Sequence, residues 1–157
     1  MNLEYFQLID RITAIDLAQR TIAVEADVPQ TGTIFEGHFP GRPLMPGVLL
    51  IEAMAQTSGW LLIAMMNIQR MPFLAAVKEA KMRSFVPPGE KLAITARLVH
   101  EGSGFAMTSA EISIGGKKTC NATLTFSHVP FPNEEFRQHM IVVAKRVGLP
   151  HLSTAHD

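Results

Sequence analysis

Residues 44–66, LMPGVLLIEAMAQTSGWLLIAMM, form the long apolar run that decides the fold expected of this chain. The run has membrane-spanning length, but Glu52 and Gln56 lie well inside it, and an unpaired carboxylate in lipid costs a few kcal/mol. We therefore predict a buried helix over residues 48–66, just after a Pro-Gly pair, and no membrane span. A helix that is apolar on almost every side needs other elements around it.

Segments rich in β-branched and apolar residues lie on both sides of this helix. Two precede it, at 6–15 and 21–28, and the polar break between them predicts a hairpin. Four follow it, and Pro-Pro-Gly or glycine turns separate them: 73–86, 91–101, 105–114 and 117–128. The glycine turns between the last three predict an antiparallel meander. The pattern predicts an α+β domain in which an antiparallel sheet curls about a central helix.

Two further segments complete the expected domain. Residues 31–47 are rich in glycine and proline, which favours a structured loop ahead of the helix. After Asn133, a plausible N-cap, the apolar residues have helical spacing and predict an amphipathic helix over 133–147. We expect residues 1–130 to form the domain and 131–157 to form a helical extension packed on it. The free edges of a curved sheet also favour pairing with a second copy.

Composition excludes several classes of function. Fourteen basic residues balance 14 acidic ones, so the chain lacks the positive field typical of proteins that bind nucleic acid. Cys120 is the only cysteine, which excludes an internal disulfide, and no local histidine favours a role for it as a nucleophile. The N-terminus does not resemble a signal peptide, so we expect a cytoplasmic protein. The histidines show no ligand spacing, and we predict no metal.

The segment 37–56, GHFPGRPLMPGVLLIEAMAQ, resembles the FabZ-type β-hydroxyacyl-acyl carrier protein dehydratases. Those enzymes have a hot-dog fold, a His in a GHFP loop, and a Glu in a helix that begins with PGV and continues as E-A-x-A-Q. The resemblance implies a single hot-dog domain that converts a β-hydroxyacyl-acyl carrier protein to the trans-2-enoyl product in the biosynthesis of fatty or specialised acyl chains. It also implies a homodimer, or a trimer of such dimers, and no cofactor beyond the phosphopantetheine that the substrate carries.

The chemistry of dehydration assigns roles to His38 and Glu52. Water loss needs a base for the α-carbon proton and an acid for the departing hydroxyl. We expect His38 to be the base, and burial to favour the acid role for Glu52. The backbone N–H of Gly47, at a helix N-terminus, is suited to hold the thioester oxygen. The resemblance implies that His38 faces Glu52 of the other subunit and that the acyl chain lies in a tunnel along the interface.

Other residues are expected to support this site. Gln56, four residues after Glu52, either orients the carboxyl or is an ordinary core amide. Phe39, Pro46 and Val48 are expected to support the catalytic pair as its neighbours. A neutral enzyme also needs a local basic rim for an acidic carrier, and only a spatial cluster would count as one. The candidates are Arg42, Lys78, Lys81, Arg83 and Lys91.

Some alternatives remain open at this point. An acyl-thioesterase and a non-catalytic acyl-thioester-binding module would use the same fold. FabA-type relatives, which also isomerise, carry Asp at the position of Glu52, so isomerisation is not favoured. The family's Leu-Pro-His-Arg segment is missing ahead of the first strand, and the extension at 131–157 goes beyond the family's usual end. The acyl length and the identity of the carrier therefore stay open.

Overall fold

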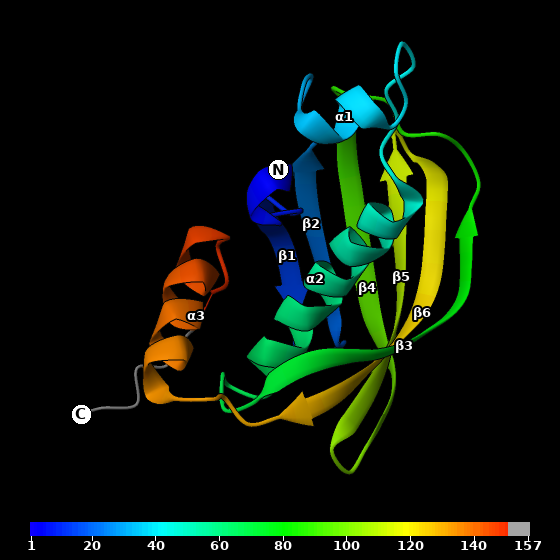
Figure 1. Ribbon diagram of the computed structural model, residues 1–157. Coiled ribbons are helices and arrows are strands. Elements are labelled where there is room, and N and C mark those ends of the chain that lie inside the picture. Colours follow the sequence, from blue (N-terminus) through cyan, green and yellow to red (C-terminus); the bar gives the residue numbers. More distant parts are fainter. Residues whose placement is uncertain (151–157) are drawn as a thin grey trace.

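The computed structural model describes residues 1–150, and a curved antiparallel sheet wraps around one long helix in it (Figure 1). This is the α+β hot-dog architecture expected from the sequence. The strands are β1 (Arg11–Asp16), β2 (Thr21–Asp27), β3 (Met71–Met82), β4 (Lys91–Gly102), β5 (Phe105–Ile114) and β6 (Lys117–Val129). The helices are η1 (Leu3–Tyr5, a 3₁₀ turn), α1 (Thr33–Gly37), α2 (Gly47–Met65) and α3 (Glu134–Arg146).

The six strands form one sheet in the order β1-β2-β4-β5-β6-β3, and every neighbouring pair is antiparallel. The predicted β1–β2 hairpin and the predicted β4–β5–β6 meander are both confirmed. After α2 the chain enters β3, which pairs with β6 and forms one edge of the sheet. Apolar side chains on this edge are exposed, among them Phe73 at 61% and Val77 at 41%.

The concave face of the sheet packs on α2. Alternate residues of β2, β4, β5 and β6 are buried, as expected for strands with one face on the core. The buried polar groups of α2 have partners: the Thr57 hydroxyl donates to the Ala53 carbonyl, and the Ser58 hydroxyl accepts from Thr108. Helix α2 alone, among the helices of residues 1–150, is long and apolar enough to cross a membrane, but it is mostly buried in this core.

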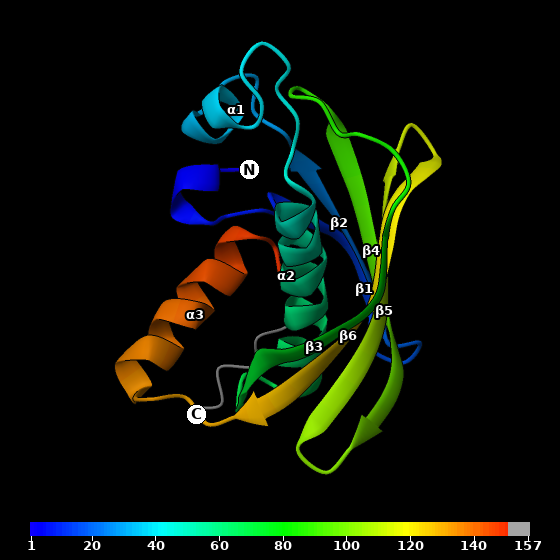
Figure 2. The same cartoon turned by 45° about the vertical axis from the view of Figure 1, so that its right-hand side comes forward.

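The expectation that α2 is wrapped on all sides is only partly correct. Val48 is 72% exposed, and Glu52 and Gln56 are half-buried on the side of the helix away from the sheet. Helix α3 lies on that same side and covers part of α2 (Figure 2). A capping hydrogen bond from the Phe136 N–H to the Asn133 side chain begins α3, which confirms Asn133 as the N-cap.

Three predicted boundaries are wrong. Residues 6–10 do not join β1, because the backbone of residues 6 and 8 hydrogen-bonds to the Gln56 side chain of α2. Within this segment the Asp10 N–H alone donates to β2, at the Glu25 carbonyl. Residues 31–47 contain the short helix α1, where the buried Phe35 anchors one turn to the core. Strand β3 ends at Met82 rather than at residue 86, and buried Val86 accepts the Met45 N–H from a loop.

Candidate active site

The loop that follows α1 holds His38 in a network of backbone hydrogen bonds. The His38 N–H donates to the Ile34 carbonyl, and the Leu44 N–H donates to the His38 carbonyl, both at 2.9 Å. Inside this closure, Phe39 and Arg42 exchange two backbone hydrogen bonds of 3.0 and 2.9 Å. These hydrogen bonds therefore give the loop around His38 a defined conformation.

The ring of His38 is oriented by a carbonyl. Its Nδ1 lies 2.9 Å from the Leu44 carbonyl oxygen, and the Phe39 ring stacks on it with centroids 4.1 Å apart. A carbonyl oxygen can only accept, so in the neutral ring Nδ1 carries the hydrogen and Nε2 carries the free lone pair. That lone pair is the feature a general base requires. The Phe39 ring therefore lies directly against the His38 ring, and its supporting role stays a prediction.

Glu52 lies on α2 and is held by Gln56. The Gln56 Nε2 donates to Glu52 Oε1 at 3.2 Å and to the Phe6 carbonyl at 2.8 Å, while its Oε1 accepts the Leu8 N–H at 3.1 Å. One amide therefore links the carboxyl to the N-terminal segment. The i, i+4 spacing predicted the contact with Glu52, but the sequence contained no signal for the two backbone partners.

The N-terminus of α2 carries unpaired donors. The Pro46 carbonyl, at the N-cap, accepts the N–H groups of Leu49 and Leu50 at 3.0 and 3.3 Å. Within residues 1–150, the N–H groups of Gly47 and Val48 have no acceptor, as expected for the first turn of a helix. Together with the helix dipole they form a site suited to an oxyanion.

Glycine at position 47 is not explained by packing. A Cβ there would meet the Met82 side chain at 3.4 Å, an ordinary contact with a flexible group, and the backbone does not have a positive φ. The fold would therefore accept alanine at this position. A close approach by a substrate atom explains the missing side chain better than the fold does.

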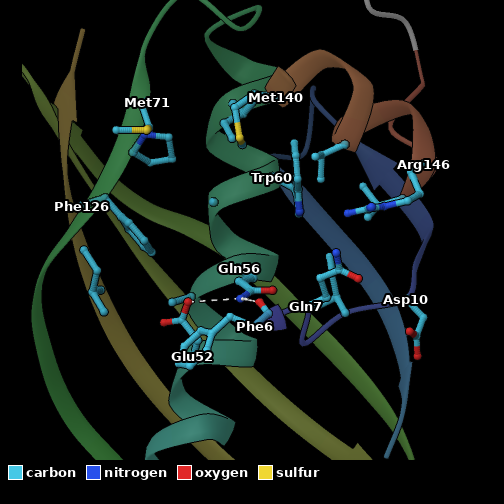
Figure 3. Close-up of a pocket in the computed structure, with 18 residues that line it drawn as sticks. Phe6, Gln7, Asp10, Glu52, Gln56, Trp60, Met71, Phe126, Met140 and Arg146 are labelled. Atoms are coloured by element: carbon cyan, nitrogen blue, oxygen red, sulfur yellow. Dashed lines mark hydrogen bonds between the residues drawn. The ribbon is translucent and has the colours of Figure 1, made fainter. Parts of the chain in front are cut away.

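A pocket of about 520 Å³ opens beside Glu52 (Figure 3). Glu52 and Gln56 lie at one end, and Met71 and Met140 lie at the opposite end. Its walls come from the N-terminal segment, α2, β3, Phe126 of β6 and α3. His38 does not line this pocket, and within residues 1–150 no hydrogen bond joins His38 to Glu52. One chain therefore does not bring the two members of the expected pair together in this pocket.

Four of the five basic candidates lie in β3 or near the residues that follow it. Lys78 and Lys81 lie in β3, Arg83 follows and donates to the Asn121 side chain at 2.9 Å, and the Arg42 guanidinium lies 5.7 Å from the centroid of the exposed Phe85 ring. Lys91 differs. Its ammonium lies 3.9 Å from Glu25 and 3.7 Å from Asp27, so its charge is already balanced.

Two other predictions concern groups outside this pocket. Burial raises the pKa of the Cys120 thiol to about 11, which disfavours the thiolate that a nucleophile needs. Among residues 1–150, no group of three or more His, Cys, Asp or Glu side chains is arranged to hold a metal. His151 and His156 lie outside the described residues, so the absence of a metal stays a prediction.

Comparison with known proteins identifies relatives over most of the chain. The model of the FabA-like domain matches residues 1–123. The 3-hydroxyacyl-[acyl-carrier-protein] dehydratase FabZ of Lactococcus lactis subsp. cremoris is 37% identical over 123 residues, which are 78% of this chain and 84% of that protein. The FabZ of Novosphingobium aromaticivorans is 37% identical over 121 residues, 75% of this chain and 76% of that protein.

Solved structures share the fold at low identity. A conserved protein of Pseudomonas aeruginosa superposes with a TM-score of 0.63 at 20% identity, covering 80% of this chain and 91% of its own. A thioesterase-like protein of Ralstonia eutropha JMP134, described as related to phenylacetic acid degradation, gives a TM-score of 0.61 at 18% identity, covering 74% of this chain and 82% of its own. Likeness at this level of identity shows the fold alone.

Proposed function

This chain belongs to the FabA-like family as a FabZ-type 3-hydroxyacyl-[acyl-carrier-protein] dehydratase, and we propose that it dehydrates its substrate between His38 of one subunit and Glu52 of the other. It is a hydro-lyase of fatty acid biosynthesis. The observation that carries the proposed site is the hydrogen bond between His38 Nδ1 and the Leu44 carbonyl, which leaves the Nε2 lone pair of the neutral ring available as a base.

In the proposed reaction, His38 Nε2 takes the proton from the α-carbon. Glu52 gives a proton to the β-hydroxyl, the C–O bond breaks, and a double bond forms between the α and β carbons as water leaves. The thioester oxygen gains negative charge during α-proton removal, and the free N–H groups of Gly47 and Val48 are suited to bind it. Pro46 supports them by capping α2, and Gln56 keeps the Glu52 carboxyl in place.

The proposal needs a second subunit because one chain separates the two groups. The β3 edge is free to pair with a second copy, and large apolar side chains near it and near the site are exposed: Phe39, Val48, Phe73 and Phe85. Such exposure favours an interface. We therefore propose a homodimer joined through this edge. The assembly of three such dimers stays a prediction.

The acyl carrier protein is the proposed partner. Its acidic surface would meet Arg42, Lys78, Lys81 and Arg83, which lie in β3 or near the residues that follow it. Lys91 is the weakest of the original candidates because it is paired with acidic neighbours. We propose that the protein uses no cofactor of its own and acts in the cytoplasm.

Complementation between two inactive variants tests the shared site. His38→Ala and Glu52→Gln should each lower turnover of 3-hydroxydecanoyl-carrier to the enoyl product by about 100-fold or more, with fold and dimer intact. If the pair spans two subunits, random exchange between the two variants should restore about a quarter of wild-type activity, because half the dimers regain one site. If subunit exchange is demonstrated and no activity returns, His38 and Glu52 of the same subunit must form the site.

The same assay tests the function itself. Ultraviolet absorbance follows the enoyl thioester, and mass spectrometry distinguishes loss of water from hydrolysis. Release of free carrier thiol instead of the enoyl product would indicate a thioesterase. Absence of any conversion by the wild type would indicate a non-catalytic module that binds acyl thioesters.

A further inference from the structure

Helix α3 lies beyond the part of the chain that the family model matches, which ends at residue 123, and yet it forms a wall of the pocket beside Glu52. Met140 and Val143 line the pocket from α3. Trp60 and Ile63 of α2, which are 7% and 4% exposed, line the same pocket. A segment outside the matched region thus contributes to the same pocket as the proposed acid.

Both ends of α3 are fixed to the domain. At its N-terminal end, the Arg137 Nε donates to the Ile68 carbonyl at 2.8 Å, just after α2. At its C-terminal end, the Ile12 N–H of β1 donates to the Val147 carbonyl at 2.8 Å, and Ala144 is fully buried. Helix α3 is therefore held at two points beside α2 (Figure 2).

The pocket changes character along its length. Glu52 and Gln56 make its proposed catalytic end polar, whereas the end at Met71 and Met140 is apolar (Figure 3). The charged side chains of Asp10 and Arg146 lie at one side of the pocket. The lining residues of α2 run from Glu52 to Ile63, which is about 16 Å of helix. This length accommodates roughly a dozen methylene groups in a staggered, extended chain.

We propose that the acyl tail of the substrate lies along α2 in this pocket and that Met140 and Val143 of α3 limit its length. This inference rests on the proposed site at Glu52, because the β-carbon must sit at the polar end for the tail to enter the apolar end. The apolar end of the pocket is continuous with the end at Glu52. An acyl chain whose β-carbon reacts at Glu52 would therefore extend into this apolar space. Each methylene buried there contributes about fourfold to binding.

A pair of variants on neighbouring positions of α3 tests the length limit. Val143→Phe adds a ring to the pocket wall, while Val142→Phe adds the same ring at a position that is 64% exposed and does not line the pocket. The assay compares kcat/KM for 3-hydroxybutyryl-, 3-hydroxydecanoyl- and 3-hydroxyhexadecanoyl-carrier. We expect Val143→Phe to lower the value for the longest chain by about tenfold or more relative to Val142→Phe, and to leave the butyryl value within about twofold.

Two results would overturn the proposal. One is an unchanged chain-length profile in folded Val143→Phe, and the other is an equal loss at every chain length. If Val143→Phe does not fold, Met140→Ala serves instead, and it should raise kcat/KM for the hexadecanoyl substrate relative to the decanoyl substrate. If kcat/KM for the hexadecanoyl substrate does not rise in this way, that result also counts against the proposal.

A binding measurement separates this inference from the proposed function. Trp60 is the only tryptophan and lies in the pocket wall, so its fluorescence reports on occupancy without any turnover. Titration with non-hydrolysable acyl-pantetheines should change the emission, with affinity rising about fourfold per methylene until the pocket is full. A wild type that binds in this way but does not dehydrate would refute the function and keep the pocket. A wild type that dehydrates with no Trp60 response at any length would refute the pocket alone.

Discussion

Replacing Gln56 with methionine should separate the two roles of this amide, because it keeps the volume and removes three hydrogen bonds. The Leu8 N–H is the costly loss, since Leu8 is 0% exposed and its donor would stay unsatisfied at about 1–3 kcal/mol. Water can reach the Phe6 carbonyl and Glu52, so the loss of each of these two hydrogen bonds adds only a few tenths of a kcal/mol to the cost. The expected loss of stability is about 2 kcal/mol, or about 4–8 °C in Tm.

The assay for this variant has two readouts. Thermal unfolding followed by circular dichroism gives the change in Tm, and formation of the enoyl thioester gives kcat and KM. With its carboxyl no longer held, Glu52 should deliver its proton from fewer productive geometries, so kcat should fall about tenfold or more while KM changes little. A Tm within about 1 °C of wild type, together with an unchanged kcat, would refute the view that Gln56 links the N-terminal segment to the carboxyl.

Four further predictions concern single positions. Gly47→Ala should keep the wild-type Tm, because only the flexible Met82 side chain is near, and should lower kcat/KM by hindering the thioester. Unchanged kinetics would refute the close approach of the substrate to this backbone position. Asn133→Ala should cost about 1 kcal/mol by removing the cap of α3, measured as a lower midpoint in urea. Cys120, with its pKa raised to about 11, should react with maleimide at about pH 8 far more slowly in the folded than in the unfolded protein. Burial, with a smaller effect of Arg70, lowers the pKa of His128, so the unfolded chain binds the proton more readily than the folded chain. The free energy of unfolding should therefore fall as the pH drops below about 6.5, and His128→Asn should make it less dependent on pH in this range.

Much of the fold follows from periodicity, and the errors have physical causes. Strand β5 begins and ends at the predicted residues, because glycine turns bound it and its alternation is regular. Residues 6–10 have the composition of a strand, but the Leu8 N–H donates to the side chain of Gln56, 48 positions away, and no local pattern encodes such a contact. The turn-rich loop likewise gave no signal for α1, which depends on the burial of Phe35.

The candidate site, like the fold, could be predicted from the sequence only in part. The GHFP and PGV segments predict that His38 and Glu52 matter, because chemistry constrains the residue types there. The sequence does not indicate that the Leu44 carbonyl fixes the tautomer of His38, since that depends on how the loop closes on itself. It also gave no reason to separate Lys91 from the other basic candidates, because its acidic neighbours come from β2.

The exposed apolar residues and the separation of His38 from Glu52, the proposed catalytic pair, point to a single cause. Phe39 stacks on His38 and yet is 52% exposed, and Val48, whose N–H is one of the proposed oxyanion donors, is 72% exposed. Side chains of this size next to catalytic groups are costly to leave in water, and a second subunit would cover them. The surface that brings His38 to Glu52 would then be the surface that stabilises the dimer. Dilution below the dimer dissociation constant should therefore abolish kcat rather than raise KM, because a separated subunit has no complete site.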